Sequence, residues 1–281
     1  MGPSLKRFFC LCRDKVADKG YSFLKRILIA FVPSVLLSLM VGAGDLTAGR
    51  YWDFPPLPPP YQYGNILMNR VSEKNGVKPV FFPHWSHRVK FTCRVCHFEL
   101  DFEFDVNKTE ITEEDNRNGI FCGTCHNGKE AFAHTPKNCD RCHTGTISLG
   151  REKFKELAKT LPEGPFGNEI DWGKAVREKH ITPLYSIFKK EEKPLAFDKP
   201  LWLTATWNFV PPAYFPHDAH TQWLDCANCH PDIFNIEKKT TESFAMKYIL
   251  EKKFCGVCHL KVAFPLDDCK GCHPAMARDK K

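Results

Sequence analysis

Residues 82–97 read FPHWSHRVKFTCRVCH, and residues 215–230 read FPHDAHTQWLDCANCH. Each stretch places a His-x-x-His pair just before a Cys-x-x-Cys-His motif, and this motif occurs six times in the 281-residue chain. The motif is typical of c-type haem attachment, in which two cysteines bind the haem vinyl groups and the histidine binds the iron. A zinc site needs no histidine after every cysteine pair, and a dithiol redox site needs only one pair. Six complete motifs therefore favour six haems over a zinc site or a disulfide framework.

The six motifs assign twelve cysteines and six histidines to haem binding. The covalently attached cysteines would be Cys93, Cys96, Cys122, Cys125, Cys139, Cys142, Cys226, Cys229, Cys255, Cys258, Cys269 and Cys272. The proximal iron ligands would be His97, His126, His143, His230, His259 and His273. Of the 14 cysteines, only Cys10 and Cys12 are left over. No disulfide framework is therefore available beyond residue 43.

The array of motifs is an internal repeat. His84, His87, Cys93 and Cys122 each have a counterpart 133 residues later, and the offset falls to 130 at Cys139. An offset held over so many chemically specific positions indicates two tandem triheme modules, which we expect at residues 76–148 and 209–276. Because modules this short contain little aliphatic core, the haems would supply most of it. We therefore predict a mainly α/coil, haem-packed multihaem cytochrome fold with little regular secondary structure.

The segments around the modules are simpler. Residues 45–75 form a Pro-rich spacer, because the run FPPLPPP at 54–60 favours extended polyproline II. Residues 149–208 form a linker between the modules. Apolar residues at 154, 157 and 161 predict a short amphipathic helix over residues 151–161, and a second short helix is expected over residues 171–179.

The histidine count bears on the second axial ligand of each iron. Twelve histidines match six irons with two ligands each, which leaves as distal candidates His84, His87, His217, His220, His134 and His180. The first four recur in both modules, and residues i and i+3 of a short helix project from the same side. His134 and His180 have no counterpart in the repeat, so the third haem of each module could instead take another ligand or stay five-coordinate. Methionine is an alternative distal ligand, but Met246 aligns with Glu113 and is expected to pack in the core.

These residues resemble the class III, cytochrome c7-type triheme domains of multihaem bacteria. The resemblance rests on residues 82–88, 93–97, 111–115, 121–132 and 139–143, on the second copies 215–220, 226–230, 254–264 and 269–273, and on residues 166–172. It implies low-spin, low-potential haems that transfer electrons in the periplasm. It also implies that His84 and His87 serve the haems of His97 and His126, and that His217 and His220 serve those of His230 and His259. The chain departs from c7 proteins in placing His134 between the second and third motifs, so the third ligand stays open.

The N-terminal region indicates export. Residues 1–26 carry seven basic and two acidic residues, and residues 27–43 are an uncharged apolar run of 17 residues. Basic residues before the run and few after it predict a cytoplasmic N-terminus. Because the run is short for a membrane span and long for a signal peptide, residues 27–44 are either a transmembrane anchor or a cleaved signal. The modules would then lie in the bacterial periplasm, held at the inner membrane or, if residues 1–43 are removed, soluble.

The formal charge of +7 does not indicate a nucleic-acid partner. Residues 1–26 account for +5 of it, which leaves +2 for the rest of the chain. Each ferric haem with two neutral histidines adds a charge of about −1 from its propionates, so the modules become mildly acidic once six haems are bound. The chain also lacks an arginine-rich run or another nucleic-acid-binding signature.

The sequence thus predicts an electron-transfer protein and not an enzyme. Two axial histidines leave no open iron position for a substrate, and haems held close together can pass electrons from one to the next. Its partners would be redox proteins, namely other multihaem cytochromes or a quinone-linked membrane complex. Two alternatives stay open: the haem subunit of a membrane quinol/quinone redox complex, and a multihaem reductase that keeps one iron five-coordinate.

Overall fold

The structure is a computed structural model that describes residues 54, 56–189, 191–205, 209–234 and 245–276. Residues 54–276 belong to one compact unit. In the described part of the chain, no helix has the length and apolar character needed to cross a membrane. The expected anchor at residues 27–44 lies outside the described residues, so the transmembrane helix stays a prediction.

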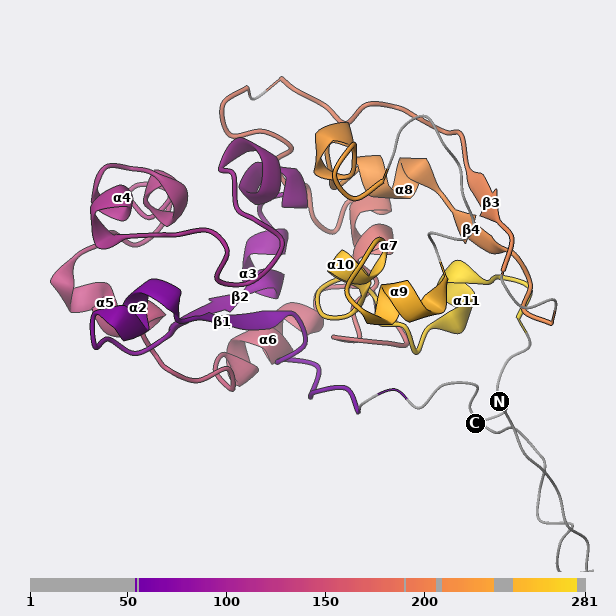
Figure 1. The fold of residues 1–281 in the computed structure, drawn as a ribbon. Helices are drawn as coiled ribbons and strands as arrows, with labels where there is room; N and C mark the ends of the chain where they lie inside the picture. The colour runs from indigo at the N-terminus through magenta and orange to yellow at the C-terminus, as the bar shows by residue number, and fades with distance from the viewer. Residues whose placement is uncertain (1–53, 55, 190, 206–208, 235–244, 277–281) are drawn as a thin grey trace, which may run out of the picture. The chain divides into compact units, whose positions relative to one another are not determined.

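The first module is built on a short β-hairpin (Figure 1). Strand β1 (Asn65–Met68) pairs antiparallel with β2 (Val80–Pro83), with Ile66 opposite Phe82. The remaining elements, in chain order, are α2 (Arg70–Lys74), α3 (His84–Arg88), η1 (Val95–Glu99), α4 (Glu113–Arg117), η2 (Phe121–Thr124), η3 (Pro136–Asn138) and α5 (Cys139–Cys142). None of these elements exceeds five residues, which agrees with the predicted sparse secondary structure.

The second module repeats this plan. Strand β3 (Leu201–Leu203) pairs antiparallel with β4 (Ala213–Phe215), and Leu201 opposite Phe215 matches Ile66 opposite Phe82. The helices that follow are α8 (His217–Thr221), η4 (Cys226–Asn228), α9 (Met246–Leu250), α10 (Gly256–His259) and α11 (Cys269–Cys272). Helix α11 contacts β4 as α5 contacts β2. Strands β1 and β3 begin before the expected module starts at residues 76 and 209, so each repeat includes part of the segment that precedes it.

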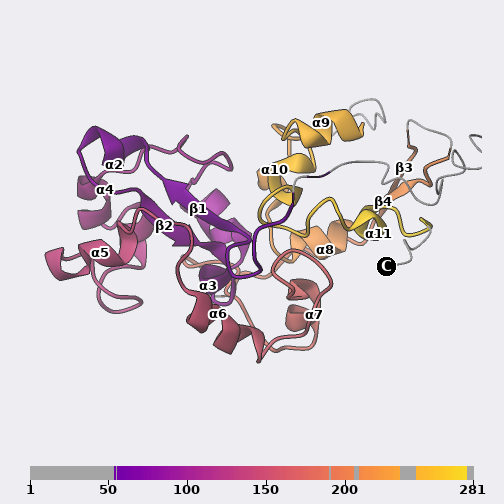
Figure 2. The same cartoon turned by 90° about the horizontal axis from the view of Figure 1, so that it is seen from below.

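The linker supplies the largest aliphatic and aromatic cluster of the described residues. Helix α6 (Arg151–Ala158) covers most of the first predicted helix, and α7 (Trp172–Arg177) lies inside the second, with Asp171 as its N-cap. Figure 2 shows these two helices close together. Their buried side chains pack with one tryptophan from each module in a single cluster: Trp85, Phe154, Leu161, Ile170, Trp172, Ala175, Ile181 and Trp223.

A buried arginine ties the first haem motif to the linker and to the second module. Arg94, whose side chain is 4% exposed, forms ion pairs with Glu99 at 2.6 Å, Asp225 at 3.0 Å and Glu192 at 3.1 Å. Its backbone N–H also donates to the Trp223 carbonyl at 2.8 Å. These bonds hold the region of Cys93 against the residues that precede Cys226.

Candidate haem-binding site

Ten histidines each make the same kind of hydrogen bond. In each, Nδ1 lies 2.6–3.1 Å from a backbone carbonyl oxygen; the ten are His84, His87, His97, His126, His143, His217, His220, His230, His259 and His273. A carbonyl only accepts, so Nδ1 must be the donor and carry the proton. Nε2 is then the unprotonated nitrogen, whose lone pair can bind a metal.

The same five bonds occur in both modules. His84 donates to Gly64 and His217 to Lys199, which are the residues just before β1 and two before β3. The third-motif histidines bind residues ahead of the second strand of each hairpin: His143 to Lys78 at 2.7 Å, and His273 to Pro211 at 2.7 Å. Residues just ahead of the hairpin strands thus provide the carbonyl oxygens that orient these four rings.

Two pairs of rings lie at the spacing that one iron requires. The ring centroids of His87 and His126 are 6.4 Å apart, and those of His220 and His259 are 6.2 Å apart. A metal–imidazole bond is about 2.1 Å long, as in zinc sites, so two imidazoles on opposite faces of one metal have ring centroids roughly 6 Å apart. The structure therefore brings together two of the four histidine pairs that the c7 resemblance implied.

The charge state of these rings also suits iron. Burial lowers the pKa of His84 to about 3 and that of His259 to about 4, although the carbonyl hydrogen bond of each ring opposes this effect. Burial is likewise the main cause that lowers the pKa of His87 and His220. The rings are therefore neutral near pH 7, which is the form that binds a metal.

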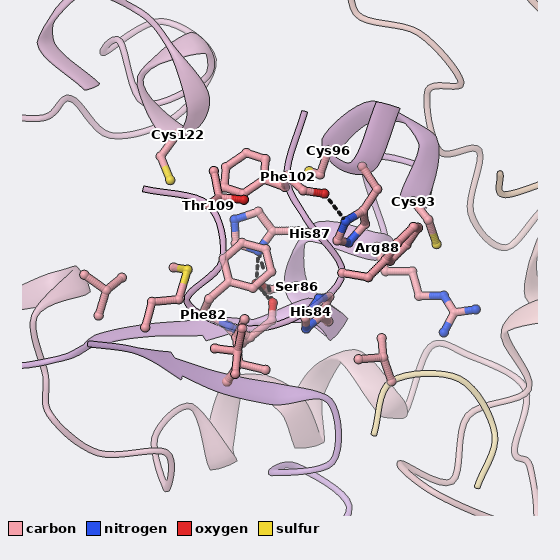
Figure 3. Close-up of a pocket in the computed structure, with 18 of the residues that line it drawn as sticks. Phe82, His84, Ser86, His87, Arg88, Cys93, Cys96, Phe102, Thr109 and Cys122 are labelled. Atoms are coloured by element: carbon pink, nitrogen blue, oxygen red, sulfur yellow. Dashed lines mark hydrogen bonds between the residues drawn. The ribbon is translucent and has the colours of Figure 1, made fainter. Parts of the chain in front are cut away.

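Ten of the twelve motif cysteines, all except Cys226 and Cys269, line an apolar cavity of about 1840 Å³, larger than the roughly 300–1,000 Å³ of an ordinary small-ligand pocket. Figure 3 shows Cys96 and Cys122 near His87, with Phe82 and Phe102 beside them. None of the twelve motif cysteines is paired in a disulfide. Burial raises the pKa of Cys96 to about 12 and that of Cys122 to about 11. An uncharged thioether, the form of a haem-bound cysteine, suits such surroundings better than a thiolate.

The second motif of each module has a local geometry that only glycine fits. A Cβ atom at Gly123 would lie 2.0 Å from the Asn116 carbonyl oxygen, and one at Gly256 would lie 1.9 Å from that of Ile249. Helix α4 or α9 thus packs directly against the motif. The preceding Phe121 and Phe254 have left-handed φ angles of 50° and 52°, which are uncommon for bulky residues. The shared Cys-Gly-x-Cys-His pattern at the 133-residue offset was the sequence signal for this feature.

His134 and His180 differ from the other ten histidines. His134 lines the cavity, and its buried Nδ1 has no hydrogen-bond partner in the described part of the chain. His180 is exposed and is not among the residues that line the cavity; its Nε2 lies 3.3 Å from the Glu178 carboxylate. His134 thus lies in the cavity, whereas His180, like the motif histidines His230 and His273, lies outside its lining, so its role as a ligand stays a prediction.

Comparison with known proteins agrees with this geometry. Residues 80–144 and 213–274 match the family model described as cytochrome c7 and related cytochrome c. A solved c7-type three-heme cytochrome domain is 30% identical and is similar over 32% of this chain and 95% of its own, with a TM-score of 0.25. The chain belongs to the cytochrome c7 family. It carries two tandem c7-type modules and binds six covalent c-type haems.

Longer cytochromes are also similar. The C-terminal hexaheme fragment of GSU1996 is 24% identical over 79% of this chain and 99% of that fragment, with a TM-score of 0.25. The dodecaheme cytochrome c GSU1996 is 22% identical over 76% of this chain and 75% of its own, with a TM-score of 0.26. No curated protein matches the chain. Membership of the cytochrome c7 family rests on the two matched modules and their motifs.

Proposed function

We propose that this c7-type cytochrome is a hexahaem electron carrier in which at least four of the six irons have two histidine ligands. The observation that carries the proposal is the set of ten histidines with Nδ1 bonded to a backbone carbonyl. Six of them belong to the motifs. The other four are His84, His87, His217 and His220, which leaves two well-oriented imidazoles for each of four haems.

These residues fix what the haem sites can do. When bound, the haems supply one-electron chemistry through their ferric and ferrous states. The carbonyl bonds of His87 and His220 hold the rings in place, so the same two nitrogens face the iron in either state. Two imidazoles fill both axial positions, which excludes a substrate from the metal. Four sites of this kind suit electron transfer and not catalysis.

The third haem of each module differs and supports a second candidate function. His143 and His273 have oriented rings, but no further histidine with a carbonyl-bonded Nδ1 lies among the described residues. His134 lines the cavity and is our candidate distal ligand for the haem of His143. The haem of His273 has no histidine candidate left once the exposed His180 is set aside. An open iron at that haem would permit a reductase activity.

We also propose that the protein works on the periplasmic side of the bacterial inner membrane, held there by residues 27–44. The uncharged run after a basic N-terminus supports the anchor, and c-type haem attachment, which in bacteria takes place on the outer side of the inner membrane, supports the location. Its partners would be other multihaem cytochromes or a quinone-linked membrane complex, because the modules carry many haems and a mild negative charge.

Haem counting and spectroscopy on the purified full-length chain test this function. Mass spectrometry should give six haems per chain. The ferrous-minus-ferric absorption spectrum should be that of low-spin haem, and dithionite reduction should be reversed by air without loss of haem. A spectrum dominated by high-spin haem, or steady turnover of nitrite or sulfite, would replace the carrier with the reductase. Recovery in the soluble fraction, with residues 1–43 absent from the purified chain, would contradict the anchor alone.

A further inference from the structure

Arg88 is a cation in the cavity without a carboxylate partner in the described part of the chain. It ends helix α3, directly after His87. Its Nε is buried and makes no hydrogen bond, and none of the ion pairs among the described residues includes it. Arg94, six residues later, shows the contrast, because it is bound by three carboxylates. An arginine remains charged at any ordinary pH, so Arg88 brings into the haem-binding region a positive charge that no described protein carboxylate neutralises.

This charge lies where the two modules meet. The Arg88 guanidinium carbon is 5.0 Å from the ring centroid of Trp172, in the linker, and 4.5 Å from that of Trp223, in the second module. The two indole faces stabilise the cation without neutralising it. Nearby, the Tyr63 hydroxyl donates to the Ala263 carbonyl at 2.6 Å. The start of the first module thus contacts the residues just after the Cys255–His259 motif.

Two haem-attachment cysteines, one from each module, are close to this cation. Figure 3 shows the Arg88 side chain beside Cys93. Burial raises the pKa of both the Cys93 and the Cys258 thiols, and the charge of Arg88 opposes that rise in each. Both cysteines line the same cavity as Arg88. The charge of Arg88 therefore acts on one attachment cysteine of the first haem of module one and on one of the second haem of module two.

We propose that Arg88 raises the reduction potentials of the two haems attached through Cys93 and Cys258. Reduction adds one electron to a haem, so a fixed positive charge stabilises the reduced form over the oxidised form. The effect is large in a site with low effective dielectric constant in which no described protein carboxylate pairs with the cation. The equivalent position in the second module is Thr221, so the charge acts only at the junction between the modules. There it favours the reduced state of the two haems. The inference rests on the proposed haem attachment, which haem counting tests separately.

The test is a spectroelectrochemical redox titration of the six-haem protein carrying Arg88→Met. Removing the charge should lower the potential of one or two haems. We expect about a tenfold change in their reduction equilibrium, which is about 59 mV for a one-electron couple. Arg88→Lys should keep the wild-type curve at the acid end of the pH range, where the lysine is charged. Arg177→Met removes an exposed cation of α7, outside the cavity lining, and should also leave the curve unchanged.

The outcomes separate the proposal from the haem assignment. A six-haem Arg88→Met protein whose curve overlays wild type, or shifts upward, overturns the electrostatic role of Arg88. If the neutral variant fails to load six haems, Arg88→Lys decides, since burial lowers the pKa of a lysine. Its junction potentials should then fall between pH 7 and pH 10 while the wild-type potentials do not. An identical pH dependence in both proteins contradicts the proposal.

Discussion

Replacing Arg94 by methionine should cost the protein a large part of its stability. The substitution keeps an apolar chain of similar length but removes the charge that three carboxylates share. Glu99 is the critical partner, because its side chain is only 6% exposed, and a buried carboxylate that loses its cation typically destabilises a protein by about 3–5 kcal/mol. Glu192 and Asp225 are 29% and 27% exposed, so each adds no more than about 1 kcal/mol.

Two features of the structure place the expected loss within that range. The Glu99 carboxylate keeps its hydrogen bonds from the Ser186 hydroxyl and the Ile187 backbone N–H at 2.9 Å, which reduces the penalty. The stacking of the Arg94 guanidinium on Tyr185, 4.9 Å from the ring centroid, is lost in addition. We therefore expect the free energy of unfolding to fall by about 4 kcal/mol.

Guanidinium titrations of the six-haem wild type and variant, followed by circular dichroism, measure this change. Arg117→Met is the matched control, because Arg117 forms an exposed pair with Glu113 one helical turn away, which is worth about 0.3–0.5 kcal/mol. If the free energy of unfolding of Arg94→Met lies within about 1 kcal/mol of that of Arg117→Met, the Arg94 cluster does not hold the first motif, the linker and the second module together.

Three further predictions follow from the site and its surroundings. Gly123→Ala should prevent haem loading at Cys122 and Cys125, because the added Cβ meets a backbone carbonyl. Gly76→Ala adds only the backbone strain of a φ of +66°, with nothing within 4 Å of the new Cβ, and should load six haems; equal loading of the two variants by mass spectrometry would refute the steric reading. His180→Gln should leave the ferric electron paramagnetic resonance spectrum unchanged, and a new high-spin signal would show that His180 is a ligand. Burial alone raises the pKa of Glu99, but bonds from Ser186, Ile187 and Arg94 outweigh it and lower that pKa. The ionised Glu99 carboxylate therefore stabilises the folded state, fully above its unfolded pKa of about 4.3. This stabilisation is lost as the pH falls through the lower pKa of Glu99 in the folded state. The drop in melting temperature over this range should be smaller in Glu99→Gln, and an identical drop would contradict it.

The repeat and its chemistry could be predicted from the sequence because they depend on side-chain type. Cysteine and histidine at fixed spacing identify haem attachment, and apolar residues at 154, 157 and 161 predict the helix that forms at Arg151–Ala158. The carbonyl oxygens that orient the histidines could not be predicted. Gly64 and Lys199 make the same bond with unlike side chains, so no residue pattern marks a backbone acceptor.

The contacts between distant segments were also beyond the sequence. Arg94 looks like a variable residue inside a Cys-x-x-Cys pair, and its partner Asp225 lies 131 residues away. Only the folded chain brings them together. The same holds for Arg88, which the sequence places after His87 as an ordinary helix-end cation, whereas the fold puts its guanidinium against tryptophans from the linker and the second module.

The central claim is that at least four irons are closed by two histidines. Quantitative electron paramagnetic resonance of the fully oxidised, six-haem protein tests it most directly, because ferric haem with two imidazole ligands is low-spin and five-coordinate haem is high-spin. The account predicts that four or more of the six irons are low-spin, with any high-spin signal confined to the third haem of a module. High-spin intensity from more than two irons per chain would contradict it.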